Sequence, residues 1–122
     1  MMKIDKNTPS VRFLQSISNA NISHRLASLV TQLLIEHIPL NSYLKRINKV
    51  DKANCPACGA SYETVKHFLL ECLGYAHKRW ALKKRLHKRN KALTLENLLG
   101  DAESTIPLTN YINASLRFTL NT

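Results

Sequence analysis

Residues 55–72 read CPACGASYETVKHFLLEC and contain all three cysteines of the 122-residue chain. Cys55 and Cys58 are separated by two residues, a spacing that lets two thiolates from one tight turn reach the same metal ion. Gly59 follows directly and can adopt the positive φ that such turns often need. The first half of the stretch therefore predicts a metal-binding turn.

The second half of the stretch supplies two further ligand side chains, His67 and Cys72. The four residues form the pattern C-x2-C-x8-H-x4-C, a full set of sulfur and nitrogen ligands for a tetrahedral Zn²⁺ ion. Because this set leaves no coordination position open, we expect a structural site. Thr64 can cap a short helix that begins at Val65 and carries His67 in its first turn. The expected zinc ligands are Cys55, Cys58, His67 and Cys72, with His77 as the alternative to His67.

Two other interpretations of the cysteines stay open. Buried, inert cysteines are common in intracellular proteins, yet two of them flanking Pro-Ala ahead of a glycine is an unusual arrangement for that role. A redox C-x-x-C pair usually follows a strand and opens a helix that lowers the pKa of one thiol, whereas residues 59–63, GASYE, have the composition of a loop. Zinc binding explains the clustering with one ion, which would also stabilise a small domain.

On both sides of this stretch the apolar residues recur with helical spacing, and no run alternates with a period of two. We therefore expect a mainly α fold, a small helical domain with one short zinc-binding loop. The expected helices are residues 9–18 capped by Thr8, residues 24–38 capped by Ser23 and closed by Pro39, a short helix capped by Asn41, residues 74–89, residues 95–99 capped by Thr94 with Gly100 as a left-handed cap, and residues 107–116.

The organisation along the chain is expected to follow three segments that form one compact unit. Residues 1–50 are an N-terminal helical segment, residues 51–92 hold the zinc-binding module and a basic helix, and residues 93–122 are a C-terminal helical tail. In the basic helix one stripe, with i, i+4, i+7 and i+11 spacing, is expected to face inward. That stripe consists of Tyr75, Arg79, Leu82 and Leu86.

The charge of the chain favours a polyanionic partner, because 18 Lys and Arg against 8 Asp and Glu leave a formal net charge of +10. Residues 78–91, KRWALKKRLHKRNK, contain eight basic residues and no acid. Like charges on one helix face cost stability unless an anion lies near, which indicates the phosphate backbone of RNA or DNA. A solvated face of incidental charge is the alternative, and Trp80 could either stack on a base or pack in the core. The expected contacts are Lys78, Lys83, Lys84, Arg85, Lys88 and Arg89.

Catalysis has little support in the sequence. The eight acidic residues are scattered, without a carboxylate cluster that could hold two metal ions for phosphodiester chemistry. The chain also has no glycine-rich phosphate loop and no nucleophile motif. We expect a protein without enzymatic activity.

The cysteine count also bears on the compartment. Three cysteines cannot all pair within one chain, and no charged-then-apolar signal precedes them, so we expect an intracellular protein of the nucleus or cytoplasm. The longest mostly apolar run, LASLVTQLLIEHI, is interrupted by Gln32 and Glu36 and is too short to span a bilayer. No membrane partner is expected.

Residues 25–80 resemble the extreme C-terminal zinc-knuckle (CCHC) segment of fungal LINE-type (non-LTR) retrotransposon polyproteins, which lies downstream of their reverse transcriptase and RNase H domains. The resemblance implies that Cys55, Cys58, His67 and Cys72 are the family's CCHC ligands, in a region that helps to hold template RNA or target DNA. The chain departs from the family at Leu73, where relatives usually have proline. It lacks the polymerase and RNase H catalytic motifs, so neither activity carries over. The matching pieces are HIPLNSYLKRI, CPACG and ETVKHFLLEC, with a weaker likeness from TLENLLGD to NYINASLRF.

Two functional classes follow. The first is a non-catalytic, zinc-binding and nucleic-acid-binding segment of a reverse transcriptase polyprotein. The second is a structural or protein-interaction module in which zinc only holds helices together. Binding to nucleic acid that weakens as salt rises would separate the two classes.

Overall fold

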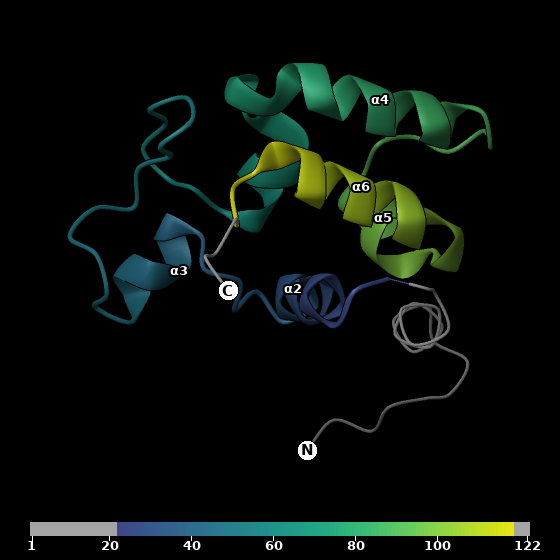
Figure 1. Ribbon diagram of the computed structural model, residues 1–122. Coiled ribbons are helices and arrows are strands. Elements are labelled where there is room, and N and C mark those ends of the chain that lie inside the picture. Colours follow the sequence, from purple (N-terminus) through teal and green to yellow (C-terminus); the bar gives the residue numbers. More distant parts are fainter. Residues whose placement is uncertain (1–21, 119–122) are drawn as a thin grey trace.

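The computed structural model describes residues 22–118, and every regular element in that range is helical (Figure 1). This confirms the prediction of a mainly α fold. The helix expected over residues 9–18 lies outside the described residues. None of the described helices combines the length and the apolar character needed to cross a membrane.

Helix α2 (His24–Leu34) begins where the sequence indicates, because the Ser23 hydroxyl accepts a hydrogen bond from the Leu26 N–H at 3.1 Å. Its end was predicted wrongly: Pro39 does not close the helix. Glu36 takes the left-handed conformation (φ 58), so that its own N–H and that of His37 donate back to carbonyls of the last turn. These two hydrogen bonds, typical of a helix C-terminus with a left-handed residue, end α2 before Pro39.

Helix α3 (Asn41–Arg46) also differs from expectation at its start. Asn41 is its first helical residue rather than its cap, and Leu40 at the cap position offers no side-chain acceptor. The carboxylate of Glu63 takes that role instead and accepts the Asn41 N–H at 2.7 Å. The Asn41 side chain is used elsewhere, donating to the Asn54 carbonyl at 2.7 Å.

The middle of the chain consists of three consecutive helical pieces. A π-helical turn, η1 (His67–Glu71), leads into a 3₁₀ turn, η2 (Leu73–Tyr75), and then into α4 (Ala76–His87). The helix expected over residues 74–89 is thus present but two residues shorter at each end. Its inward stripe is as predicted, since Tyr75, Arg79, Leu82 and Leu86 are the buried residues of η2 and α4.

The C-terminal part contains α5 (Leu95–Gly100), the 3₁₀ turn η3 (Ala102–Ser104) and α6 (Thr105–Ser115). Thr94 caps α5 as predicted, its hydroxyl accepting the Asn97 N–H at 3.1 Å. The left-handed cap at Gly100 is not formed, because Gly100 is the last residue of the helix and Asp101 follows in an extended conformation (φ −109). Leu116, with φ 57, takes the left-handed position after α6.

Helix α6 lies between α4 and α2 and packs against both (Figure 1). Phe68, which is fully buried, stands at the centre of this packing, with its ring 5.3 to 5.4 Å from the rings of Tyr75, Tyr111 and Phe118. The Tyr111 hydroxyl donates to the Phe68 carbonyl at 2.5 Å. One hydrophobic cluster therefore includes residues from α2, the cysteine stretch, α4, α5 and α6.

Candidate metal centre

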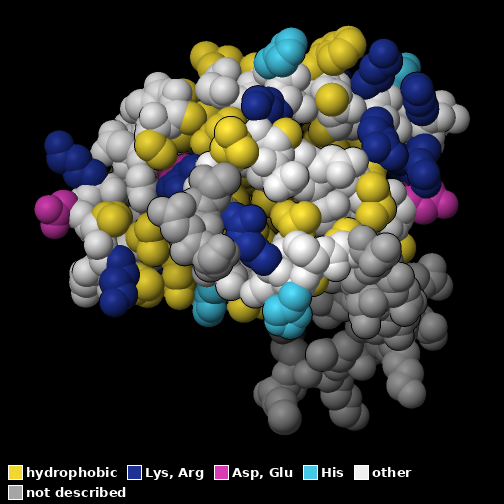
Figure 2. Space-filling model, in the orientation of Figure 1, with side chains coloured by type: hydrophobic (Ala, Val, Ile, Leu, Met, Phe, Trp, Pro, Cys, Tyr) yellow, Lys and Arg dark blue, Asp and Glu magenta, His cyan; other side chains and the backbone are white. Residues whose placement is uncertain are grey.

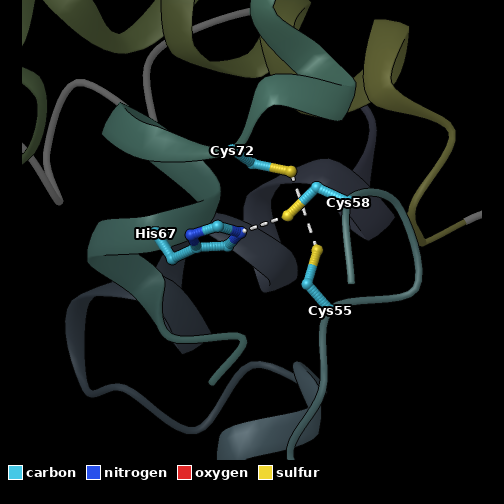
Figure 3. Close-up of side chains that lie close together, drawn as sticks. All are labelled: Cys55, Cys58, His67 and Cys72. Carbon is cyan, nitrogen blue, oxygen red and sulfur yellow. Dashed lines mark hydrogen bonds between the residues drawn. The ribbon is translucent and has the colours of Figure 1, made fainter. Parts of the chain in front are cut away.

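The structure gathers the four predicted ligands into one cluster. One ligand atom from each of Cys55, Cys58, His67 and Cys72 lies within 4.8 Å of the other three. Figure 3 shows the four side chains pointing toward one another, two from the turn at residues 55–58, one from the first residue of η1 and one from Cys72, which directly follows η1. Within residues 22–118 this is the one group of three or more such side chains close enough to hold a metal ion.

The distances within the cluster suit a tetrahedral ion. The sulfur atoms of Cys55 and Cys72 are 3.6 Å apart, and the Cys58 sulfur is 3.2 Å from His67 Nε2. Ligands at the usual zinc bond lengths in a tetrahedron are about 3.8 Å apart for two sulfurs and about 3.5 Å apart for sulfur and nitrogen. Shifts of a few tenths of an ångström would thus bring these pairs to coordination geometry.

The turn that carries Cys55 and Cys58 is closed by its own backbone. The Gly59 N–H donates to the Cys55 carbonyl, and the Cys55 N–H donates to the Ala60 carbonyl, both at 2.8 Å. Gly59 has φ 80, the positive value that the sequence predicted. A residue with a side chain would be strained in this conformation.

The other two ligands depend on the geometry of η1. The Thr64 hydroxyl accepts the His67 N–H at 3.0 Å, so the predicted cap is formed. The Cys72 N–H then donates to the His67 carbonyl at 2.8 Å, five residues back. Residues five apart point about 140° away from each other around an α-helix, whereas a π-helical turn brings them toward the same side. The extra residue in this turn thus helps both ligands to face the cluster.

The orientation of the His67 ring determines which of its two nitrogens can bind a metal ion. Nε2 faces the cluster, and Nδ1 lies 3.9 Å from a carboxylate oxygen of Glu71. A carboxylate near the second nitrogen of a metal-binding histidine favours the tautomer with the proton on Nδ1 and leaves Nε2 free to bind the metal. The alternative ligand, His77, is exposed and is not part of the cluster.

The thiols of the cluster differ in acidity. The backbone N–H of Ala60 lowers the pKa of Cys58, whose thiol is exposed. Burial, followed by the neighbouring Cys55 thiol, raises the pKa of Cys72 to about 11. A cation that binds here must therefore displace a proton from Cys72, which couples metal binding to pH.

An ion pair lies directly behind the cluster. The carboxylate of Glu63, which is fully buried, receives two 2.7 Å hydrogen bonds from the Arg117 guanidinium and lies 4.0 Å from the Cys55 sulfur. Nothing in the sequence indicates a role for either residue. They are 54 positions apart, and no local pattern connects them.

Arg79 supports the other side of the cluster. Its buried guanidinium donates to the Leu69 carbonyl at 3.1 Å and to the Cys72 carbonyl at 2.5 Å, which completes the hydrogen bonding of the backbone that leaves η1. The sequence placed Arg79 on the inward stripe of its helix but did not indicate this role. An arginine at a buried helical position was the available signal, because a buried charge needs partners.

Gly74 allows the turn at residues 55–58 to lie against η2, the 3₁₀ turn that contains this glycine. A Cβ at position 74 would come within 2.7 Å of the Ala57 Cβ and within 2.8 Å of the Ala57 carbonyl oxygen. Contacts this short require the backbone of the turn to move. Gly74 is thus a structural requirement of the candidate site.

The residues expected to bind phosphate are all exposed on α4 and just beyond it, and they differ in their partners. Lys78 donates to the Ala114 carbonyl at 2.8 Å, and Arg89 pairs with Glu103 at 2.7 Å. The side chains of the other four form no ion pair with a described carboxylate. These are Lys83, Lys84, Arg85 and Lys88.

Trp80 does not pack in the core, since 61% of its surface is exposed, and Lys84 Nζ lies 5.0 Å from its ring centroid. The cluster of three cysteines and one histidine is thus joined to a helix whose outer face carries cations and an indole. Comparisons of the chain with protein-family models, with curated proteins and with solved structures found no match.

Proposed function

We propose that this chain is a non-catalytic, zinc-stabilised module that binds the phosphate backbone of RNA or DNA. The observation that carries the proposal is the outer face of α4. Four basic side chains on this face and directly after it are exposed and have no carboxylate partner among residues 22–118: Lys83, Lys84, Arg85 and the C-cap residue Lys88. Figure 2 shows Lys and Arg side chains gathered over the C-terminal part of α4, with acidic side chains only at the border.

Zinc is the ion that the donor set favours. Three thiolates and one imidazole are soft and borderline ligands, which exclude Mg²⁺ and Ca²⁺ as occupants. Zn²⁺ accepts such a set in a closed tetrahedron and has no redox chemistry, which fits a structural role. The groups around the ligands support this assignment, because a carboxylate lies near His67 Nδ1 and a backbone N–H lowers the pKa of Cys58.

The metal site and the basic helix are mechanically connected. Cys72 immediately precedes η2, which continues into α4, and Arg79 in the first turn of α4 donates to the Cys72 carbonyl. An ion bound at Cys72 would fix the start of the helix relative to the core. The cations on its outer face would then be presented in a constant arrangement along a backbone of regularly spaced phosphates.

The proposal of a non-catalytic role is supported by the positions of the acidic side chains. Glu63 is paired with Arg117, and Asp101 and Glu103 pair with Lys91 and Arg89. Carboxylates held in this way are not gathered for two-metal phosphodiester chemistry. The likeness to retrotransposon C-terminal segments remains a hypothesis about the origin of the chain, and it would agree with a role in holding template RNA or target DNA.

The test is a titration of the zinc-loaded protein with nucleic acid at increasing salt. Replacing Lys83 and Lys88 by Gln removes two charges whose side chains form no hydrogen bond, ion pair or ring contact with another described residue, and glutamine keeps the helix propensity. If both contact phosphate, the logarithmic slope of affinity against salt should fall by about 1.5. Zinc content should not change, because no ligand lies in α4.

The matched control is Lys45→Gln with Lys49→Gln, which removes the same charge from exposed positions at the end of α3 and beyond it. For this control, the logarithmic slope of affinity against salt should stay within about 0.5 of the parent value. The two lysines lie away from the proposed phosphate contacts, so their charges act on the nucleic acid only through screened, long-range electrostatics. A parent protein that does not bind at low salt would contradict the proposal. So would equal slopes for the α4 variant and the parent, and the structural-module alternative would then replace it.

A further inference from the structure

A groove runs between α4 and α6 beside the exposed basic face. It encloses about 520 Å³, within the range of roughly 300–1,000 Å³ typical of pockets that take up small ligands. Trp80 and Ala81 form its wall on the α4 side, and Pro107 and Asn110 contribute from α6. We call this hollow the α4–α6 groove.

The lining of the α4–α6 groove combines aromatic and apolar walls with a cationic edge. Lys78 and Arg85 line it together with Trp80, and no carboxylate does. The Asn110 side chain, which is exposed, makes no hydrogen bond within residues 22–118, so its amide is free to donate and to accept. The groove thus offers a flat π surface, two cations and one neutral amide.

The indole is held in place without being covered on the groove side. Lys84 Nζ lies 5.0 Å from the ring centroid of Trp80, yet Lys84 is not among the residues that line the groove. The Lys84 ammonium therefore restrains the Trp80 ring without occupying the groove. Lys78 connects α4 to α6 across the groove, since its ammonium donates a hydrogen bond to the Ala114 carbonyl of α6 at 2.8 Å. The ammonium has two further N–H donors for a ligand.

We propose that the α4–α6 groove takes up an unpaired nucleotide of a single-stranded nucleic acid. Its base would lie against the indole of Trp80 with an edge toward Asn110, and its phosphates beside Lys78 and Arg85. This inference rests on the proposed function and narrows its ligand to single strands. Bases of a duplex are stacked on each other and cannot enter a groove, whereas an unpaired base presents both faces to an aromatic side chain.

An apolar or acidic peptide is the other occupant to consider. The charge of the groove edge favours a polyanion, and Arg85, which lines the groove, is also one of the unpaired cations that the proposed function assigns to phosphate. A strand lying along α4 would reach both surfaces at once. The nucleotide is therefore the occupant that the charges favour.

The chain has a single Trp, so its fluorescence reports on the groove without labelling. The zinc-loaded full chain would be titrated at low salt with oligouridylate and oligothymidylate, with a blunt-ended duplex of similar length, and with an abasic strand. We expect the two base-containing single strands to quench the fluorescence. The duplex and the abasic strand should bind through phosphates with little quenching.

Trp80→Leu, whose binding is measured by the fluorescence anisotropy of a dye-labelled strand because the variant has no Trp, should bind the base-containing strands about 5- to 150-fold more weakly, the range expected for one lost base–aromatic stack. It should leave affinity for the duplex and for the abasic strand unchanged, and Trp80→Phe should recover most of the loss. Folding should tolerate these changes, because the side chain is mostly exposed. Tyr62→Leu is the matched control, since Tyr62 is an equally exposed aromatic residue outside the groove and should have no effect.

Single-strand binding without quenching, or equal losses for single strand and duplex in Trp80→Leu, would overturn the groove inference while the proposed function stands. Absence of binding to every nucleic acid at low salt would overturn both. Quenching by an acidic amphipathic peptide, with none by single strands, would assign the groove to a protein partner and overturn the inference.

Discussion

Glu63 is a single side chain that serves three distant parts of the molecule. Its carboxylate pairs with Arg117, accepts the first N–H of α3 and lies beside the Cys55 sulfur. The sequence could not predict this, because a glutamate between Tyr62 and Thr64 looks like a surface residue. Its role depends on contacts that exist only after the chain has folded.

Replacing Glu63 by Gln should destabilise the protein by about 3 kcal/mol, because it removes one partner of a buried ion pair and leaves the other uncompensated. Urea unfolding of the zinc-loaded protein measures the change. Glu96→Gln, at an exposed position without an ion pair among the described residues, should change stability by less than about 0.5 kcal/mol. Equal effects of the two substitutions would contradict this account of Glu63.

Tyr75 and Tyr111 are buried phenols in the core around Phe68. Burial raises the pKa of each from 10.0 to about 12, because the charged phenolate is poorly solvated there. The unfolded chain releases these protons at lower pH than the native state does. The stabilisation is therefore complete below pH 10 and is lost as pH rises from 10 to 12.

The loss of stability between pH 10 and 12 should be smaller in Tyr75→Phe, because this variant lacks one of the two phenols. The Tyr75 hydroxyl has no hydrogen-bond partner among the described residues, so its removal breaks no hydrogen bond. Denaturant unfolding at several values between pH 10 and 12 provides the measurement. The exposed Tyr62 serves as control, and Tyr62→Phe should leave the pH profile unchanged. A profile that is the same in Tyr75→Phe and in the parent would show that this phenol does not carry the effect.

Among the elements, those with local start signals were predictable and those with distant partners were not. Ser23 and Thr94 cap α2 and α5 with their own hydroxyls, three residues from the donor, so the sequence alone contains the signal. The start of α3 is stabilised by a carboxylate 22 residues away, and a glutamate in an unusual conformation ends α2. Neither feature has a local sequence pattern.

The same distinction applies to the candidate metal site. The four candidate ligands could be predicted from the sequence because they lie within one short stretch with characteristic spacing. The π-helical turn η1 could not be predicted, since its residues have ordinary helix propensities. Its extra residue matters only for the relative positions of His67 and Cys72. The supporting contacts likewise depend on tertiary packing: Arg79 of α4 contacts the backbone of η1 and Cys72, and Gly74 of η2 lies against the turn at residues 55–58.

Gly74→Ala tests the packing of the turn at residues 55–58 against η2. The new Cβ would clash with the Ala57 backbone, so the turn must shift and the sulfur atoms it carries must move. We expect zinc affinity to fall by about 10- to 100-fold, as for other changes that disturb the support of metal ligands. Competition with a chromophoric chelator measures the affinity. Ala81→Gly, at an exposed position of α4, should weaken the helix slightly and leave zinc affinity unchanged.

For the molecule as a whole, we expect one zinc ion per chain and a loss of the fold around residues 53–75 when it is removed. Cys58→Ser should release the metal, because three ligands and a hydroxyl cannot replace the closed set. Elemental analysis and amide hydrogen exchange would measure the two effects. Less than half an equivalent of zinc in reduced, metal-replete parent protein would contradict the expectation.

The position of Phe68 connects the candidate metal site to the centre of the hydrophobic core. This residue follows the candidate ligand His67 directly, and its ring contacts those of Tyr75, Tyr111 and Phe118. With Zn²⁺ bound at His67, displacing the metal would loosen the centre of the hydrophobic core. Each tenfold rise of free zinc above the dissociation constant would then add about 1.4 kcal/mol to stability. The lifetime of the protein against proteases would follow the zinc supply of its surroundings.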